Sequence, residues 1–170
     1  MSFLKRSSTS LLLGMAISLS AISAEAADIV RTPLPGSDFP ISQSVLIPAG
    51  AETLIVSGAI AKPAKPDAPK GSAEYWGDTE AQSFSVLTQL EEALKAKGFS
   101  LNDVVSMQAF LVGDPAKEGK LDFAGFMKAY VKFFATPTNP NKPARYALQI
   151  AALAAPGALI EIAVTAAKVK

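Results

Sequence analysis

Two segments with apolar residues at helical spacing constrain the fold more than any other feature of this chain. In residues 79–97 apolar side chains recur every three or four positions, at Ala81, Phe84, Leu87, Leu90 and Leu94. Thr79 and Gln82 have the spacing of a capping box at the start of this helix, and Gly98 is a good stop signal. A second helix is predicted after its capping residue Asp122, with an apolar stripe of Phe123, Phe126, Met127, Tyr130, Val131 and Phe134.

Five β-rich segments surround these helices in the sequence. The predicted strands are residues 44–47, 53–60, 104–112, 145–153 and 158–166. The first two flank the turn-rich residues 48–51 and therefore predict a hairpin, whereas residues 27–38 predict an extended arm. The resulting order, β-β-α-β-α-β-β, is typical of an α+β domain in which both helices pack on one face of a mixed sheet.

The residue types that are missing remove several classes of site. The 170 residues include no cysteine, which excludes disulfides, thiolate zinc sites and a cysteine nucleophile. They also include no histidine, which excludes a Ser-His-Asp triad and imidazole metal sites. With a formal net charge of +1, the chain lacks the basic field that holds nucleic acid. We therefore expect no metal or organic cofactor and no nucleic-acid partner.

The first 26 residues are typical of a secretory signal peptide. Lys5 and Arg6 precede a short apolar run at 11–17, and Ala24-Glu25-Ala26 supplies the small-x-small pattern before a cleavage site. The alternative is a membrane anchor, but the apolar run is short for a bilayer span. We expect a single mature domain, residues 27–170, that lies in a bacterial periplasm and is free of the membrane. Its fourteen basic and fourteen acidic residues leave no formal net charge.

The last predicted strand is apolar on both of its sides. One side, expected to face the helices, consists of Ile160, Ile162 and Val164. The other side combines Glu161 with Leu159, Ala163 and Thr165, whereas a sheet face that meets water is normally polar. We therefore expect other copies of the chain to cover this second face. The alternative is a monomer with an ordinary apolar surface.

Arg145 and Glu161 stand out because of where they lie in the sequence. After the expected cleavage only Arg31 and Arg145 are arginine, and Arg145 begins an apolar strand. Its guanidinium fork can bind a carboxylate through two parallel hydrogen bonds. Glu161 is the only acid after Asp122 and lies within an apolar strand. Its carboxylate is therefore either paired with a cation or has a pKa raised by its surroundings. A purely structural alternative is an ion pair between these two residues across neighbouring strands.

Five segments, taken in order, resemble the RidA/YjgF family, the reactive intermediate deaminases. They are residues 54–58 (LIVSG), 98–105 (GFSLNDVV), 130–134 (YVKFF), 143–151 (PARYALQIA) and 157–162 (GALIEI). The resemblance implies a chorismate-mutase-like fold and a homotrimer with clefts between its subunits. It also implies hydrolysis of enamines and imines derived from amino acids to 2-oxo acids and ammonia. The implied partner is a small carboxylate-bearing metabolite.

The resemblance also implies roles for individual residues. Arg145 matches the family's carboxylate-binding arginine, and Glu161 matches the glutamate that holds the attacking water. Ser57 and Gly58 match a strand motif that lines the cleft. Ile41 stands where the family has a tyrosine that closes over the substrate.

Two further positions depart from the pattern, because Met127 and Gln89 stand where the family has asparagine. The long loop at 62–78 contains Tyr75 and Trp76, which either cover the cleft or pack the loop onto its own domain. These departures keep open a second function, a non-catalytic trimer that binds carboxylates or serves as a scaffold. A ribonuclease, an activity attached to the family by name, is disfavoured because histidine and a basic surface are missing.

Overall fold

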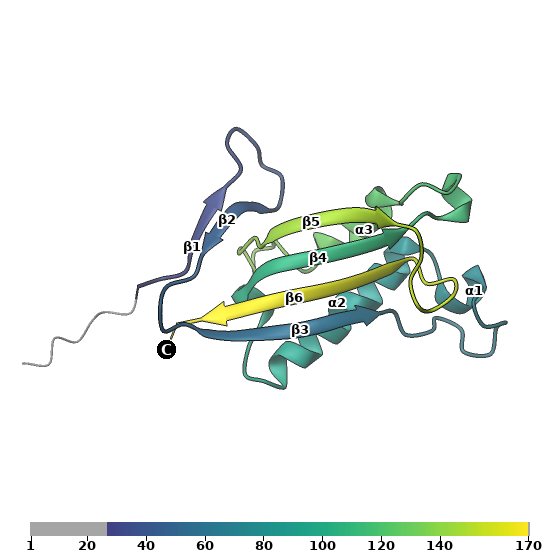
Figure 1. The fold of residues 1–170 in the computed structure, drawn as a ribbon, viewed down its shortest axis with the longest axis horizontal. Coiled ribbons are helices and arrows are strands. Elements are labelled where there is room, and N and C mark those ends of the chain that lie inside the picture. Colours follow the sequence, from purple (N-terminus) through teal and green to yellow (C-terminus); the bar gives the residue numbers. More distant parts are fainter. Residues whose placement is uncertain (1–26, 170) are drawn as a thin grey trace, which may run out of the picture.

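The computed structural model describes residues 27–169 as a twisted sheet with its helices on one side (Figure 1). The expected signal peptide, residues 1–26, lies outside the described residues. In chain order the elements are β1 (Val30–Pro33), β2 (Ser42–Leu46), β3 (Glu52–Ile60), α1 (Ala73–Trp76), α2 (Thr79–Lys95), β4 (Val104–Val112), α3 (Phe123–Tyr130), β5 (Ala144–Ile150) and β6 (Ile160–Lys168). No helix within residues 27–169 has the length and apolar character needed to cross a bilayer.

The sheet is mixed, as the sequence predicted, and its six strands lie in the order β1-β2-β5-β4-β6-β3. β4 and β5 run parallel over seven residue pairs, and β6 pairs antiparallel with both β4 and β3. The parallel pair requires a crossover, which α3 and its flanking loops provide. This arrangement confirms an α+β fold with α2 and α3 on one face (Figure 1).

The predicted hairpin between residues 44–47 and 53–60 is wrong. β3 lies at the opposite edge of the sheet from β2 and pairs with β6 instead. The reason is burial, since Leu54 and Val56 of β3 pack against the core, whereas β2 is mostly exposed. β2 pairs with β1 instead, and it bridges to β5 only where Ser42 meets Ala144. β1 lies inside the expected extended arm and was not predicted as a strand, because turn-forming residues flank it.

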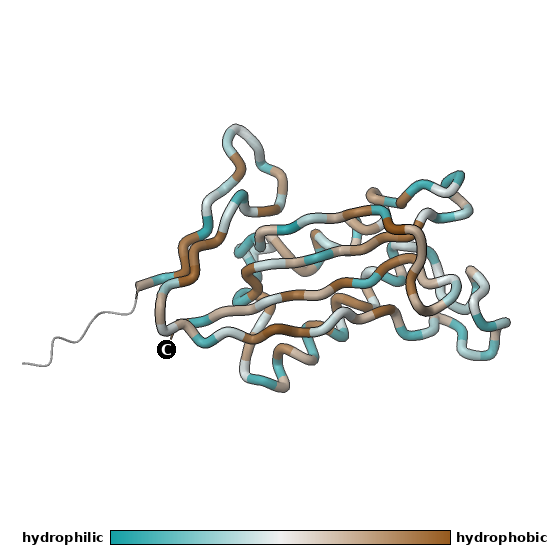
Figure 2. The backbone as a smooth tube through the Cα atoms, in the orientation of Figure 1, coloured by the Kyte–Doolittle hydropathy of each residue, from teal (hydrophilic) through white to brown (hydrophobic). Residues whose placement is uncertain are grey.

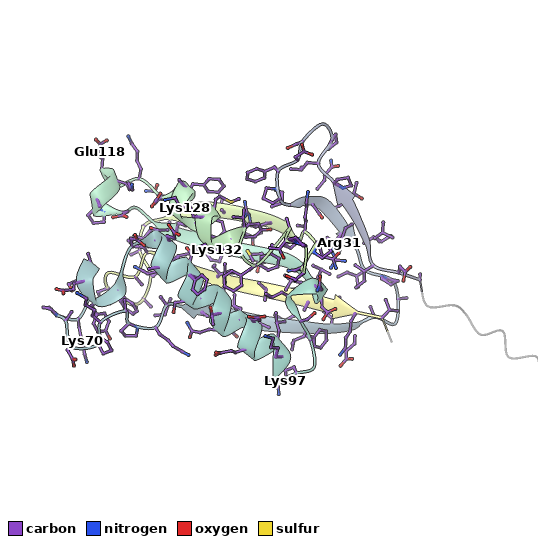
Figure 3. The ribbon with its side chains drawn as sticks, turned by 180° about the vertical axis from the view of Figure 1, so that it is seen from behind. Arg31, Lys70, Lys97, Glu118, Lys128 and Lys132 are labelled. Carbon is purple, nitrogen blue, oxygen red and sulfur yellow. The ribbon has the colours of Figure 1, made fainter. Side chains whose placement is uncertain are left out.

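The β1–β2 hairpin projects from the main sheet, and an arginine in β1 helps to anchor it. Arg31 of β1 donates from Nη2 to the carbonyl oxygens of Asn102 (3.0 Å) and Val104 (3.2 Å), at the start of β4. In Figure 3, which shows the helix side, Arg31 lies between the hairpin and the rest of the sheet. Burial lowers the pKa of Arg31, and the nearby Asp103 opposes that shift. One of the two arginines within residues 27–169 therefore has a structural role.

The last two strands are not neighbours, because β4 lies between β5 and β6. β5 also ends at Ile150, three residues earlier than predicted, and the chain then turns through Pro156 and Gly157 before β6 begins. A connection of this length lets the chain cross the end of β4, so that β6 pairs with the side of β4 opposite to β5. The ion pair proposed across adjacent strands for Arg145 and Glu161 consequently has no structural basis within one chain.

The core lies between the sheet and the two longer helices. α2 contributes Val86, Leu87, Leu90 and Leu94, and the facing strands contribute Met107, Ala109, Leu111, Ile160, Ile162 and Val164, all at most 2% exposed. Burying each large aliphatic side chain is worth about 1.5–3 kcal/mol. Most of the apolar positions predicted from the helical and alternating patterns therefore lie in the core. Four of the predicted helix-stripe residues are instead exposed: Ala81, Phe84 (45%), Phe123 (38%) and Val131 (47%), the last because α3 ends at Tyr130.

Both helix starts are capped, although one cap differs from the prediction. Asp122 caps α3 as expected, accepting from the backbone N–H of Gly125 at 3.0 Å. At α2 the capping residue is Asp78, which accepts from the N–H of Ala81 at 2.8 Å, and not Thr79. Gln82 is fully buried and is used for a tertiary contact. Its side chain donates to the Gly77 carbonyl at 2.9 Å and accepts from the backbone N–H of Leu159 at 2.8 Å.

The loop at 62–78 packs onto its own domain, which decides between the two interpretations of its aromatic residues. Trp76 is buried, and its indole N–H donates to the carbonyl oxygen of Pro156 at 2.8 Å. Gly157 φ is +80°, and a Cβ there would collide with the Gly71 carbonyl. The loop is therefore held against the segment that leads into β6.

Candidate functional site

Arg145 lies on the helix-covered face of the sheet, near the start of β5. It pairs with Met107 of β4, whose side chain is fully buried toward the helices. Its guanidinium carbon lies over four aromatic rings, at 4.3 Å from the centroid of Tyr130, 5.0 Å from Phe126, 5.5 Å from Phe39 and 5.8 Å from Phe123. These distances are within the range of cation–π attraction.

The guanidinium of Arg145 has no anionic partner among residues 27–169. Its Nη1 donates to the thioether sulfur of Met127 at 3.3 Å, and sulfur is a weak acceptor. The guanidinium also makes a side-chain hydrogen bond with Tyr130, so both of its partners are uncharged, and the residue is only partly buried. Burial lowers the pKa of Arg145, and Tyr130 opposes that shift, but arginine stays protonated. A half-buried cation whose partners are all uncharged is suited to bind an anion.

Residues 39–42, called the N-terminal motif below, lie beside the start of β5 and next to Arg145. Tyr130 donates its hydroxyl hydrogen to the carbonyl oxygen of Pro40 at 2.7 Å. Ser42 donates its backbone N–H to the Pro143 carbonyl at 2.9 Å and its hydroxyl to the Lys142 carbonyl at 2.6 Å. These bonds hold Phe39 over the guanidinium. Ile41, in contrast, packs against the core.

Glu161 lies on the other face of the sheet, which no helix covers. It is directly opposite Phe110 of β4 and Ile60 of β3. The pairing of β3 with β6 shifts register between Val56 and Ala59, so Ser57 and Gly58 form a bulge beside Glu161. A Cβ at Gly58 would collide with Glu161 Oε1, so the glycine leaves room for this carboxylate in its present position.

The structure brings the predicted site residues together in two groups and not in one. Arg145 and Ile41 belong to the helix side, whereas Glu161, Ser57 and Gly58 belong to the open face. Within residues 27–169, the Glu161 side chain makes no ion pair or hydrogen bond, and the Arg145 side chain makes none with any acid. A single chain therefore does not assemble both groups around one ligand.

The open face is strongly apolar, as predicted from the sequence. Ile55 of β3 is 78% exposed, and Tyr146 and Leu148 of β5 are each 49% exposed. Figure 2 shows hydrophobic stretches in β3 and in the β1–β2 hairpin. Leu159 does not contribute, contrary to the prediction, because its position before β6 leaves it only 8% exposed. Apolar patches of this kind mark contact surfaces in soluble proteins.

The sequence analysis missed Phe39, whose ring lies over the Arg145 guanidinium, and singled out Ile41 instead. The aromatic residue directly before Pro40 was the sequence feature that could have indicated it. Gln89 makes a structural contact, since its side chain donates to the carbonyls of Ile60 (3.0 Å) and Ser85 (3.2 Å). In the described part of the chain no group of three or more acidic residues is placed to hold a metal ion.

Comparisons with known proteins agree with this architecture. The family model described as Endoribonuclease L-PSP matches residues 40–168. A RutC family protein of Sulfurisphaera tokodaii is 34% identical over 129 residues, covering 76% of this chain and 88% of that protein. A RutC family protein of Leuconostoc mesenteroides is 32% identical over 141 residues, with 82% and 96% of the two chains covered.

Solved structures show the same fold. A protein of unknown function of the Rid family from Yersinia pestis has a TM-score of 0.61 at 24% identity, covering 82% of this chain and 98% of that one. A protein of unknown function from Pseudomonas aeruginosa has a TM-score of 0.54 at 26% identity, with 84% and 92% covered. Because the family model and these relatives span nearly all of the described domain, the chain belongs to the Rid/YjgF family, also described as endoribonuclease L-PSP.

Proposed function

We propose that this protein hydrolyses reactive 2-imino acids, and the enamines that tautomerise to them, to 2-oxo acids and ammonia. The observation that carries the proposal is the half-buried guanidinium of Arg145, whose hydrogen-bond partners, Met127 and Tyr130, are both uncharged and which has no ion pair within residues 27–169. A carboxylate supplies the missing anion and matches the planar fork with two parallel hydrogen bonds. Binding in this way fixes the position of the neighbouring C2 atom, which is the electrophile.

Glu161 is the proposed general base and acid. Its carboxylate accepts a proton from a water molecule as the water oxygen bonds to C2 of the protonated imine. The resulting carbinolamine receives that proton on its nitrogen. The C–N bond then breaks, ammonia leaves, and the C2 hydroxyl loses its proton as the carbonyl of the 2-oxo acid forms. No oxidant, reductant or cofactor enters this balance.

The proposed active site is built by two copies of the chain. Arg145 and Glu161 lie on opposite faces of one sheet, so one ligand meets both only where two subunits adjoin. The exposed apolar residues Ile55 and Leu148 lie on the same face as Glu161 and supply a surface that a second copy can cover. We propose a homotrimer, in which cyclic repetition of one contact creates equivalent clefts.

A second candidate, binding without turnover, is favoured by one specific observation. Met127 and Ile41 replace polar residues of the family pattern, and in the structure they place a thioether against Arg145 and an aliphatic side chain against the core. A site with these substitutions still binds a carboxylate through Arg145. RNA cleavage is a weaker candidate, because the chain has no histidine to act as acid or base.

The decisive experiment gives the processed protein 2-aminoacrylate generated in situ and follows the release of 2-oxo acid and ammonia. We expect release faster than the uncatalysed background, lost in Arg145→Ala and in Glu161→Gln. Arg145→Lys should restore little, because a point charge does not reproduce two parallel bonds. Background rates with intact carboxylate binding would reject hydrolysis in favour of the binding function.

The place of action is a separate proposal. The signal-like N-terminus favours export to the periplasm, with a mature chain that begins near Ala27. Fractionation followed by N-terminal sequencing tests this directly. An intact N-terminus in the membrane fraction would identify an anchored protein instead.

A further inference from the structure

The four rings around Arg145 differ in exposure. Phe126 and Tyr130, the inner rings, are fully buried and lie closest to the guanidinium. Phe39 and Phe123, the outer rings, are each 38% exposed. The outer rings are nearly parallel, with 14° between their planes and 6.4 Å between their centroids. The solvent-facing rim of the Arg145 site is therefore aromatic.

The same surroundings offer almost no polar group to a ligand. The Tyr130 hydroxyl is already used by the Pro40 carbonyl, and the Met127 sulfur already accepts from Arg145. A ligand with a second polar group would leave that group without a partner once it is desolvated. A site that meets its ligand with rings in place of donors and acceptors selects against polar side chains.

We infer that the Arg145 site prefers 2-imino acids, and the corresponding 2-oxo acids, that carry a large apolar and especially an aromatic side chain. The inference rests on the proposed function and names its substrate class. With the carboxylate on the guanidinium, the substituent at C2 is only a few bonds away and lies against Phe39 and Phe123. Removing an aromatic substituent from water at this rim is worth about tenfold or more in affinity over a methyl group.

Titration calorimetry of the full mature protein with phenylpyruvate and pyruvate tests the inference without any need for turnover. We expect phenylpyruvate to bind at least about tenfold more tightly. Phe39→Ala and Phe123→Ala should each lower the ratio of the two affinities several-fold. Phe39→Leu, which keeps apolar bulk but loses the ring, guards against a change caused by altered folding.

The matched control is Phe84→Ala. Phe84 is another exposed phenylalanine, but it lies on α2 and packs against Phe133 at 5.1 Å between ring centroids, away from Arg145. This change should leave the ratio unaltered. Equal affinities for the two acids, or a ratio that survives loss of both outer rings, would overturn the inference.

Two outcomes separate this inference from the hydrolase proposal. Selective binding of phenylpyruvate without hydrolysis of the matching imine supports the ligand class and rejects the hydrolase. Hydrolysis of the imines of alanine and phenylalanine with equal kcat/KM supports the hydrolase and rejects the aromatic preference.

Discussion

The two faces of the central sheet hold their charged residues in opposite settings. On the helix-covered face, Arg145 is surrounded within its own chain by four rings and the Met127 sulfur. On the open face, Glu161 has Gly58 beside it, but its carboxylate makes no hydrogen bond within residues 27–169. The arginine therefore has its immediate surroundings in place, whereas the glutamate lies on a surface that is apolar and uncovered.

This difference suits a site that is shared between two subunits. A binding residue benefits from rigid support in its own chain, because it then loses little conformational entropy when the ligand binds. A residue that handles water needs a face that another subunit closes. The comparison predicts that the two residues act together only across an interface, and the following changes test it.

The largest effect is expected from mixing two inactive variants. Arg145→Ala and Glu161→Ala should each abolish imine hydrolysis when expressed alone. Co-expressed in equal amounts, they form clefts that take an intact arginine from one subunit and an intact glutamate from the next. Random assembly makes roughly one cleft in four complete, so about a quarter of the activity should return. If activity stays absent although mixed trimers form, the two residues do not act across an interface.

Assembly itself is the next test, through the apolar character of the open face. Leu148→Lys should turn the proposed trimer into monomers, because a buried lysine without a partner is costly at an interface. Val131→Lys is the matched control, since Val131 is 47% exposed on the helix side and Leu148 is 49% exposed on the open face. Light scattering measures both. A monomeric wild-type protein, or a trimeric Leu148→Lys variant, contradicts the proposed interface.

The sequence predicted the central part of this fold well because burial there follows local periodicity. Met107, Ala109 and Leu111 alternate and are all buried. The three leucines of the predicted α2 stripe are buried as well, whereas Ala81 and Phe84 at its start are exposed. The strand order was not predictable in the same way. Residues 44–47 and 53–60 look like a hairpin locally, but β3 pairs with the distant β6, and Leu54 and Val56 then pack against the core.

The site was predicted in part. The isolated Arg145 and Glu161 were visible from composition and position, and the collision of a Gly58 Cβ with Glu161 gives the glycine a physical role. Which face each residue occupies depends on register, which the sequence does not state. Phe39 was missed because its place over Arg145 depends on the hydrogen bond between Tyr130 and Pro40.

A smaller effect, confined to function, is expected from Gly58→Ala. The added Cβ displaces the Glu161 carboxylate, which is the flexible end of an otherwise unpaired side chain, so the fold should tolerate it. We expect hydrolysis to fall at least about tenfold, since a misplaced base loses most of its contribution, while Tm changes little.

The double variant Gly58→Ala with Glu161→Gln shows whether the glycine acts through the glutamate. If it does, Gly58→Ala causes almost no further loss of hydrolysis in a protein that already carries Glu161→Gln. Fully additive losses would mean that Gly58 serves the site in another way.

The smallest effect concerns the hydrogen bond that places Phe39 on the helix side. Tyr130→Phe removes the hydroxyl that donates to the Pro40 carbonyl at 2.7 Å, a bond worth about 1 kcal/mol of stability. Chemical denaturation should show that loss, and carboxylate affinity should fall with it, because Phe39 is no longer held over Arg145. Tyr75→Phe is the control, since the Tyr75 hydroxyl makes no hydrogen bond within the described domain. Unchanged stability and affinity in Tyr130→Phe would mean that the N-terminal motif is held by Ser42 alone, through its bonds to Lys142 and Pro143.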